Sequence, residues 1–213
     1  MNIEDIITKK IGEKRRRKWL KKMRSRLDNH DFSIISNNCC AGVIYSDLGI
    51  QFKSPTINLY FNSEDFLLFV KNLKSYIAGQ LKDISSTTDK TFPVGSLTPC
   101  NSMLPAIKIY FMHYEAWDKA YESWIKRCNR INFENLFFLW EYNKENTEFT
   151  LIQEFDTLPI KKMIFSYEEL PGIKNYFRFL FSDKFQPGEI LKITEQGKRN
   201  IDEFDYVHFL NSK

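Results

Sequence analysis

The residues of this chain best suited to proton transfer lie near position 113. His113 and Tyr114 follow the apolar run 106–112, whose aromatic and β-branched residues predict a buried central strand. Imidazole titrates near neutral pH, so a histidine at a strand end is a candidate general acid or base. Tyr114 adds a hydrogen-bond donor, and Asp118 is an acid that could assist. A structural histidine, bonded within the fold, is the alternative.

A second polar group follows the apolar run 32–36, which also predicts a buried strand. Asn37, Asn38 and Cys39 stand between this strand and a helix predicted over 41–48. Free N–H groups at a helix N-terminus suit a phosphate or carboxylate, and asparagine side chains offer both donors and acceptors. The alternative is a helix cap with an Asx turn, which uses the same residue types.

The cysteines suggest a nucleophile only at one position. A helix N-terminus lowers the pKa of a thiol, so Cys39 is a candidate, although a small packed residue is the more ordinary role of a free cysteine. Cys39, Cys40, Cys100 and Cys128 form no CxxC pair and no zinc-like spacing. We therefore expect reduced thiols and no metal. Glycine is sparse, no phosphate-binding or dinucleotide motif occurs, and we expect no cofactor.

Four further residues complete the predicted substrate-binding set: Arg127, Arg130, Ser54 and Asp156. The two arginines could clamp a phosphate, and a solvated basic helix face is the alternative. Asp156, like Asp118, is an acid that could assist His113 or bind a metal. No DxD spacing accompanies it, so a metal-dependent nucleotide-sugar site is not predicted.

These side chains meet only if the chain folds as an α/β protein. Strands are predicted over 32–36, 56–61, 106–112, 136–140, 162–165 and 189–193, with 92–97 as a short edge strand or an extended loop. Helices are predicted over 3–28, 41–48, 63–78, 115–129 and 148–158. The alternation indicates βαβ units, and so a single domain with a mostly parallel sheet and helices on both faces, a Rossmann-like three-layer arrangement. Ligands of such sheets bind beyond the carboxyl ends of the strands. The loops at 37–40, 62–63 and 113–114 should therefore form the site.

The N-terminal segment differs from the rest in charge. Residues 1–31 hold eleven Lys/Arg and five Asp/Glu, a net charge of +6, whereas residues 32–213 carry −2. We predict a basic helical segment followed by the α/β domain. Gly12 weakens the middle of the segment, so two short helices are an open alternative.

This basic segment suggests a contact with an anionic membrane surface through residues 3–28, where Trp19, Leu20 and Met23 would supply apolar contacts. A solvated helix docked on the domain is the alternative. The near-neutral body and the lack of a recognition motif argue against nucleic acid as a partner. No stretch resembles a secretory leader or approaches the ~18–20 apolar residues that span a bilayer. We expect a cytoplasmic protein, peripheral to the membrane at most.

Five segments in consistent order resemble a family of bacterial domains: SNNCCAGVIYSDLG, FKSPTINLYF, FPVGSL, IYFMHYEAWDKAYESWIKRCNRIN with NLFFLW, and FDTLPIKKMIF. The resemblance covers residues 32–210. It implies bacterial origin, an α/β fold and a link to exopolysaccharide or capsule biosynthesis, without established catalytic residues. Two features depart from the family pattern: Cys40 replaces a tryptophan, and residues 98–105 look inserted.

Two functional hypotheses follow. The first is a cytoplasmic enzyme, a transferase acting on a phosphorylated or nucleotide-linked sugar or a glycan precursor. The second is a non-catalytic, membrane-proximal partner of a polysaccharide assembly complex. The sequence leaves the reaction and the oligomeric state open.

Overall fold

Four parallel strands form the larger of two sheets in the computed structural model, which describes residues 3–180 and 188–212. Its order is β1-β5-β6-β7, and every neighbouring pair is parallel. The strands are β1 (Ser33–Ser36), β5 (Leu136–Glu141), β6 (Lys161–Ser166) and β7 (Tyr176–Arg178). The predicted parallel α/β sheet is present, and three of its strands lie where the sequence indicated.

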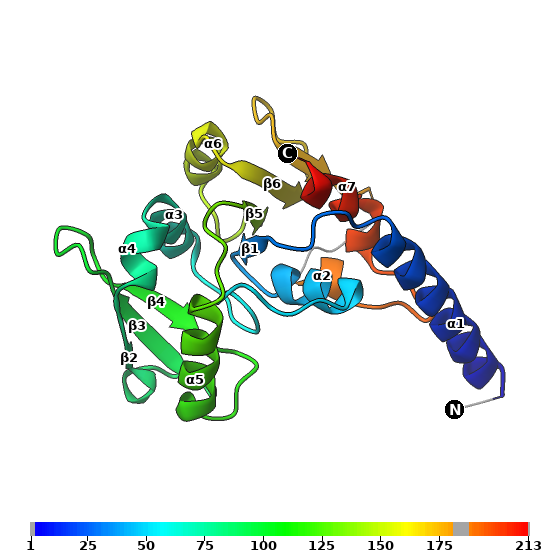
Figure 1. Cartoon of the computed structure of the whole chain (residues 1–213), viewed down its shortest axis with the longest axis horizontal. Helices are drawn as coiled ribbons and strands as arrows, with labels where there is room; N and C mark the ends of the chain where they lie inside the picture. The colour runs from blue at the N-terminus through cyan, green and yellow to red at the C-terminus, as the bar shows by residue number, and fades with distance from the viewer. Residues whose placement is uncertain (1–2, 181–187, 213) are drawn as a thin grey trace.

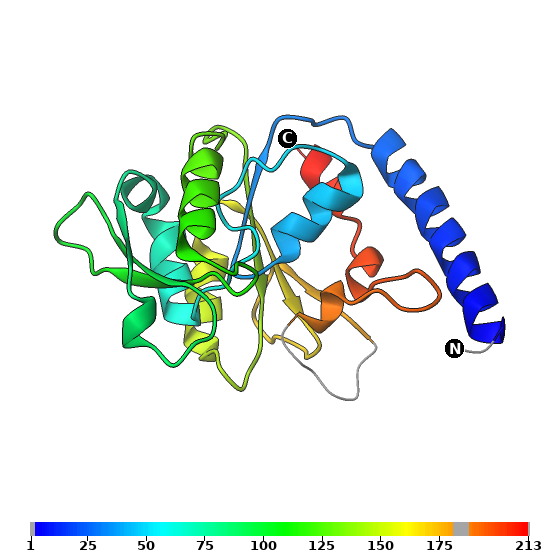
Figure 2. The same ribbon diagram turned by 90° about the horizontal axis from the view of Figure 1, so that it is seen from below.

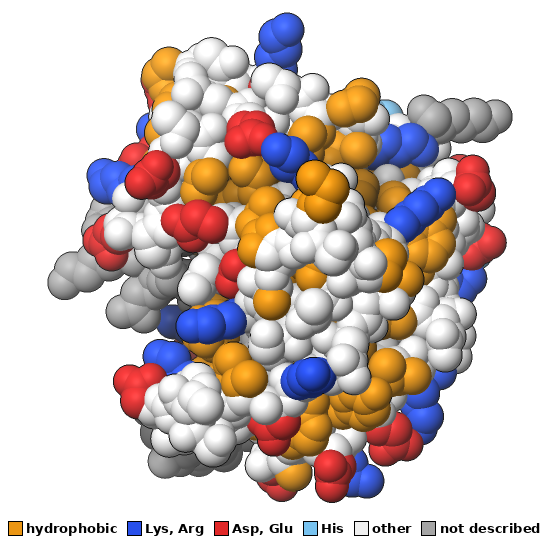
Figure 3. Space-filling model, turned by 90° about the vertical axis from the view of Figure 1, so that its left-hand side faces the viewer, with side chains coloured by type: hydrophobic (Ala, Val, Ile, Leu, Met, Phe, Trp, Pro, Cys, Tyr) orange, Lys and Arg blue, Asp and Glu red, His pale blue; other side chains and the backbone are white. Residues whose placement is uncertain are grey.

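The second sheet is antiparallel and was not predicted. Its order is β2-β3-β4, with β2 (Gln80–Asp83), β3 (Val94–Thr98) and β4 (Ile107–Tyr110). The expectation that runs 92–97 and 106–112 join the parallel sheet is therefore wrong, and β4 is an edge strand rather than a central one. Ile107 and Ile109 are buried while Lys108 is exposed, an alternation typical of an antiparallel strand with one solvated face. On this side of the molecule basic and acidic side chains are interspersed (Figure 3).

Helices pack against both sheets (Figures 1 and 2). They are α1 (Ile3–Ser25), α2 (Cys40–Leu48), α3 (Ser63–Lys71), α4 (Leu73–Ile77), α5 (Trp117–Cys128), α6 (Phe149–Thr157) and α7 (Tyr206–Asn211), with 3-10 turns η1 (Ser85–Thr87), η2 (Glu189–Leu191) and η3 (Asn200–Glu203). The helix predicted over 63–78 breaks at Asn72, and the strand predicted over 189–193 is η2 instead. No helix in the described ranges has the length and apolarity to cross a membrane.

Strand β5 is buried on both of its faces. Phe138 and Trp140 pack into a core formed with α3, α4, α5, α6 and the antiparallel sheet. Phe137 and Leu139 point the other way, into a core formed with α2, α7 and the end of α1. A strand covered on both sides reads as a continuous apolar run, which is why LFFLW was recognisable in the sequence. Each large apolar side chain buried in these cores contributes about 1.5–3 kcal/mol.

A two-residue bridge joins the two sheets. Tyr60 exchanges backbone hydrogen bonds with Tyr110 of β4, at N···O distances of 2.9 and 3.0 Å, and Phe61 N–H donates to the carbonyl of Asn37 at 3.0 Å. The strand predicted over 56–61 is therefore wrong: only Tyr60 makes a ladder pair, and Asn58 adopts a left-handed φ of 62° before it. The bridge places the end of β4 beside the end of β1.

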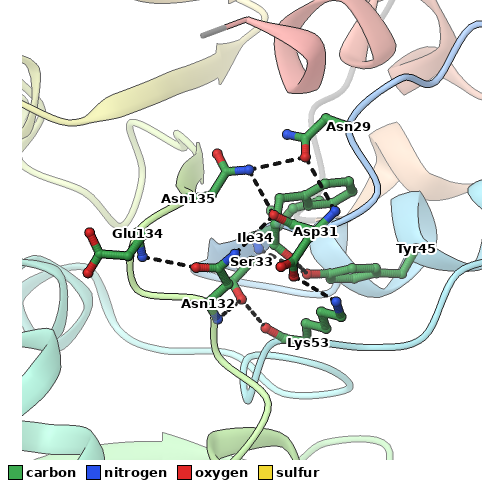
Figure 4. Close-up of polar contacts among 10 residues, drawn as sticks. Asn29, Asp31, Ser33, Ile34, Tyr45, Lys53, Asn132, Glu134 and Asn135 are labelled. Atoms are coloured by element: carbon green, nitrogen blue, oxygen red, sulfur yellow. Dashed lines mark hydrogen bonds and ion pairs between the residues drawn. The ribbon is translucent and has the colours of Figure 1, made fainter.

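Side chains form hydrogen bonds with the backbone groups on the free edge of β1. Ile34 N–H donates to the hydroxyl of Tyr45, and Ser36 N–H donates to Oγ1 of Thr56. At the start of the strand, Asn132 and Asn135 both donate to the carbonyl of Asp31 (Figure 4). These contacts occupy backbone groups that an edge strand would otherwise present to another chain.

Helix α1 is attached to the domain by a buried ionic cluster. Arg16 is paired with Asp47 of α2 and, at 2.5 Å, with Asp202 of η3, and Arg199 also binds Asp47 at 2.8 Å. Gly12 lies against the loop 194–198, where an added Cβ would come within 2.0 Å of a backbone oxygen. The helix is therefore continuous, and its glycine provides room for this loop rather than a break between two helices.

We expect Arg16→Ala to lower the free energy of unfolding by about 3–5 kcal/mol, because it leaves two buried carboxylates without their shared cation. Urea unfolding followed by circular dichroism measures the change. Arg17→Ala, next along the chain but exposed, is the matched control and should change stability by less than about 0.5 kcal/mol. Equal effects of the two substitutions would contradict the role of the cluster.

Candidate functional site

A cavity of about 990 Å³ lies beyond the carboxyl ends of β1 and β5. Its lining comes from the segment after β1, the first turns of α2 and α3, the loop 52–62, the segment after β4, the end of β5 and the region of η2. Six asparagines belong to the lining: Asn37, Asn38, Asn58, Asn62, Asn143 and Asn146. The position agrees with the rule that parallel sheets bind ligands at their carboxyl edge.

The last residue of β5, Glu141, contributes a buried carboxyl group to the cavity. The residue is only 6% exposed, and its oxygens accept hydrogen bonds from the Asn38 amide and from Gly188 N–H, the latter at 3.0 Å. Burial raises the pKa of Glu141 to about 7, although the two hydrogen bonds act to lower it. Both protonation states are therefore populated near neutral pH, as a general acid or base requires.

The two asparagines after β1 hold this carboxyl in place. Asn37 donates to the backbone carbonyl of Glu141 and accepts from its N–H, at 3.1 and 3.0 Å, and so extends the pairing of β1 with β5. Asn38 accepts from Cys40 N–H at 3.0 Å, which forms an Asx turn at the start of α2, while its amide donates to Glu141. The helix-cap alternative for this loop therefore describes part of what these residues do.

The two helix starts at the cavity differ in how they are capped. The first N–H groups of α2 are occupied, because Cys40 N–H bonds to Asn38 and Ala41 N–H to the Ser36 hydroxyl. The N-cap residue of α3, Asn62, makes no side-chain cap hydrogen bond, and Glu64 stands in the first turn of this helix. A phosphate at either end would meet occupied donors or a carboxylate. Lys192, which lines the cavity and is exposed, is better placed to contact an anion.

The structure brings His113 to the same cavity as Asn37, Asn38 and Cys39, as the sequence analysis predicted. The strand topology that positions His113 differs from the predicted one, because His113 follows β4, which is antiparallel to its neighbour. Its neighbour Tyr114 does not line the cavity.

Tyr114 and Arg127 instead support one wall of the cavity from behind. The Arg127 guanidinium donates to the Tyr114 hydroxyl at 2.6 Å and to the carbonyl of Ile57 at 3.2 Å. It also lies over the ring of Phe52, 5.3 Å from the centroid. Phe52 lines the cavity, so this contact ties α5 to the loop that closes it.

The other predicted site residues lie outside the cavity lining. Ser54 is buried and hydrogen-bonds Thr56, whereas Asp118 and Arg130 are exposed at the two ends of α5. Asp156 accepts hydrogen bonds from Lys174 and Asn175 ahead of β7, at the amino edge of the sheet. These bonds outweigh burial and lower its pKa. The structure does not bring these four residues to the cavity, and their roles at the site remain predictions.

Burial sets the chemistry of Cys39, which lines the cavity. It raises the pKa of the Cys39 thiol to about 11, and the nearby Glu141 carboxylate acts in the same direction. The expected lowering by a helix N-terminus is outweighed. Among the described residues, no group of three His, Cys, Asp or Glu is placed to hold a metal ion.

The central residue of the site, Glu141, was missed by the sequence analysis. Its signal was available: a lone carboxylate directly follows the apolar run 136–140 at a predicted strand end. The asparagines at 58, 62, 143 and 146 carry no comparable signal, because isolated asparagines are common in loops.

The fold and the cavity define an α/β protein with a parallel sheet that carries an amide-rich pocket around a buried carboxyl group. A family described as "Domain of unknown function (DUF1919)" matches residues 10–211, and the chain belongs to this family. A Haemophilus influenzae protein described as "Uncharacterized protein" is 34% identical over 207 residues, which cover 95% of this chain and 96% of that protein. The predicted membership of an uncharacterised bacterial domain family is confirmed, and the link to polysaccharide remains a prediction.

The raised pKa of Glu141 predicts a specific dependence of stability on pH. Between its ordinary pKa of 4.5 and about 7, the folded protein keeps the proton that the unfolded chain has lost, so stability falls as pH rises. Relative to Glu141→Gln, the free energy of unfolding of the native chain should decrease by about 3 kcal/mol from pH 4.5 to 8. Urea midpoints at several pH values measure this. The exposed Glu134→Gln should show no such trend, and a flat difference for Glu141→Gln would contradict the assignment.

The raised pKa of Cys39 predicts low reactivity toward alkylating reagents. With a pKa of about 11, the thiolate fraction at pH 7 is roughly one in ten thousand, about a hundredfold below that of an ordinary thiol. Iodoacetamide should therefore modify Cys39 at least roughly a hundredfold more slowly than free glutathione, as followed by mass spectrometry of the Cys39 peptide. Modification at the rate of glutathione would show that the thiol is activated.

Proposed function

We propose that this chain is an enzyme of bacterial surface polysaccharide biosynthesis that transfers a group to or from a sugar of a glycan precursor bound in the cavity. The observation that carries the proposal is the Glu141 carboxyl, buried at the strand ends with a pKa near 7. A buried carboxyl with a strongly shifted pKa inside a large pocket is characteristic of a catalytic acid or base.

The lining favours a carbohydrate as the bound group. An asparagine amide offers donors and acceptors, the combination that a sugar hydroxyl can satisfy. Asn58, Asn62, Asn143 and Asn146 belong to the cavity lining in addition to Asn37 and Asn38, whose amides bind Glu141 and the start of α2. The rings of Phe52 and Tyr60, also in the lining, offer apolar surface for the C–H face of a sugar ring. A pocket with a few polar groups on an apolar wall is the usual form of a small-molecule site.

The charges of the lining favour the sugar over the phosphate as the main recognition element. Within the described lining, Glu64 and Glu141 are acidic, Arg199 is already paired with Asp47, and Lys192 is an exposed cation. A phosphate or nucleotide attached to the sugar would therefore extend toward Lys192 at the mouth of the cavity. The interior is left for hydroxyl groups.

In the proposed step the Glu141 carboxylate acts as the general base. It takes the proton of an acceptor hydroxyl as that oxygen forms its bond to the transferred group. The bond between this group and its leaving group breaks at the same time, and the leaving group departs with the electron pair. Asn38 and Gly188 N–H, which bond the carboxylate, fix its orientation for the transfer. His113 lines the same cavity and is the candidate to protonate the leaving group.

The polysaccharide context rests on the resemblance of five ordered segments over residues 32–210. The geometry supports a sugar substrate by itself, so the biochemical and the biological parts of the proposal can be tested separately.

The biochemical test uses the purified chain with a panel of hexose phosphates and nucleotide-linked sugars. We expect at least one ligand to raise the melting temperature and to be turned over. Glu141→Gln should still bind this ligand but lose turnover by about 10²–10⁴-fold, the usual contribution of a general acid or base. Glu64→Gln, at a second acidic residue of the described lining, is the matched control and should retain turnover within a few-fold. Full turnover by Glu141→Gln would rule out the proposed role.

The biological test compares bacteria that lack the chain with bacteria complemented by native protein or by Glu141→Gln. Loss of surface polysaccharide with the variant, at unchanged protein level, supports the pathway. Normal surface polysaccharide in the strain that lacks the chain and in the Glu141→Gln strain would contradict the role in polysaccharide biosynthesis. The enzymatic part of the proposal would still depend on the biochemical test.

A further inference from the structure

Helix α1 carries two different faces. Gly12, Arg16 and Met23 are buried against the domain, as is Leu27 just beyond the end of the helix, and Trp19 packs edge to face on Tyr206 of α7. The apolar residues Trp19 and Met23, which the sequence analysis assigned to a membrane, are thus directed toward the protein core.

The opposite face of α1 is a lysine stripe. At 100° per residue, a line opposite Arg16 runs through Ile7, Lys10, Ile11, Lys14, Lys18 and Lys21. All six side chains are exposed, with Ile7 and Ile11 at 51% and 46%. No acidic residue interrupts this line, and none of its four lysines forms an ion pair with a carboxylate in the described part of the chain.

The charge of this helix is not shared by the rest of the protein. Residues 3–25 hold ten Lys/Arg and three Asp/Glu, a charge of +7, so the remaining chain carries −3. On the face formed by the antiparallel sheet and its helices, basic and acidic side chains are interspersed (Figure 3). The positive charge is thus concentrated on one element, which lies along one edge of the molecule (Figures 1 and 2).

The lysine stripe lowers the stability of helix α1 itself. Lys10, Lys14 and Lys18 follow one another at i,i+4 spacing, and like charges at this spacing weaken a helix. No carboxylate in the described part of the chain pairs with these lysines, because the stripe faces away from the domain. An external anionic surface would compensate this repulsion.

We propose that the lysine stripe of α1 docks this protein on a membrane surface that contains anionic lipid. The lysines fit the headgroup charge, and Ile7 and Ile11 lie on the same line, where they can enter the boundary between headgroups and acyl chains. A soluble polyanion would use the charges but would have no contact for two half-exposed isoleucines. The lipid is therefore the partner that uses all six side chains.

The docked helix would hold the cavity at a defined orientation. On the inner face of α1, Arg16 shares Asp47 with Arg199, and Arg199 lines the cavity. The membrane-facing stripe and the site are thereby connected through one buried ionic cluster, without an intervening flexible linker.

The experiment is flotation of the full chain with vesicles of phosphatidylcholine alone or with phosphatidylglycerol added. We expect binding only to the anionic vesicles. The stripe variant Lys10→Gln/Lys14→Gln/Lys18→Gln/Lys21→Gln should bind at least tenfold more weakly, because each cation near the surface contributes roughly fivefold to the binding constant. The matched control Lys82→Gln/Lys90→Gln/Lys108→Gln/Lys119→Gln removes four exposed lysines elsewhere and should bind like the native chain.

Two further measurements separate lipid from other anions. Ile7→Ser/Ile11→Ser should weaken vesicle binding severalfold and leave binding to heparin, a soluble polyanion, unchanged. Circular dichroism and melting temperature check that each variant folds. Equal losses in the stripe and control variants, vesicle binding that survives in the stripe variant, or a double-serine variant that binds vesicles like the native chain would each overturn the proposal. The last outcome would indicate a soluble polyanion as the partner.

Discussion

The two sheets of this protein are held together by Tyr60 and Phe61, and the candidate site depends on this bridge. Tyr60 pairs with Tyr110 at the end of β4, and Phe61 pairs with Asn37 at the end of β1. Three residues beyond Tyr110 lies His113, and beside Asn37 lies Glu141. The two sheets also share a hydrophobic core, and these few backbone hydrogen bonds fix the ends of their strands side by side, so that His113 and Met112 complete one wall of the cavity.

The protein buries charge in two different ways. In the cluster of Arg16, Asp47, Asp202 and Arg199, two cations are paired directly with two carboxylates. Among the described residues, the Glu141 carboxyl accepts hydrogen bonds from one side-chain amide, that of Asn38, and from one backbone N–H, that of Gly188. Neutral donors compensate part of the desolvation, and the remainder appears as a pKa near 7. A cation beside Glu141 would stabilise the fold but would also hold the carboxyl ionised, which is unsuitable for a group that exchanges protons.

Much of the parallel half of the fold could be predicted from the sequence. The runs 32–36, 136–140 and 162–165 are strands, and 41–48, 115–129 and 148–158 are helices, because each has a strong apolar pattern and a clear boundary. The antiparallel half could not, since short strands resemble one another until the pairing partner is known. The alternation of Ile107, Lys108 and Ile109 was the usable signal, and it was outweighed by the aromatic content of the run. The meeting of His113 with Asn37 and Asn38 was thus predicted correctly from an incorrect topology.

The basic run 14–18 shows why sequence could not separate the roles of its residues. The five consecutive residues 14–18 are all basic, so the sequence does not distinguish them. In the structure Arg16 is the buried one of the five, and its neighbours on both sides are exposed. The helical period decides this: once Met23 and Leu27 enter the core, Arg16 must face the domain and Lys14 and Lys18 must face away. Arginine suits the inward position, because its planar fork can bind Asp47 and Asp202 at once. Lysine suits the outward one, as a hydrated point charge on a flexible stem. The same helix can therefore be both a structural part of the domain and a surface for an external partner, with its period keeping the two roles apart.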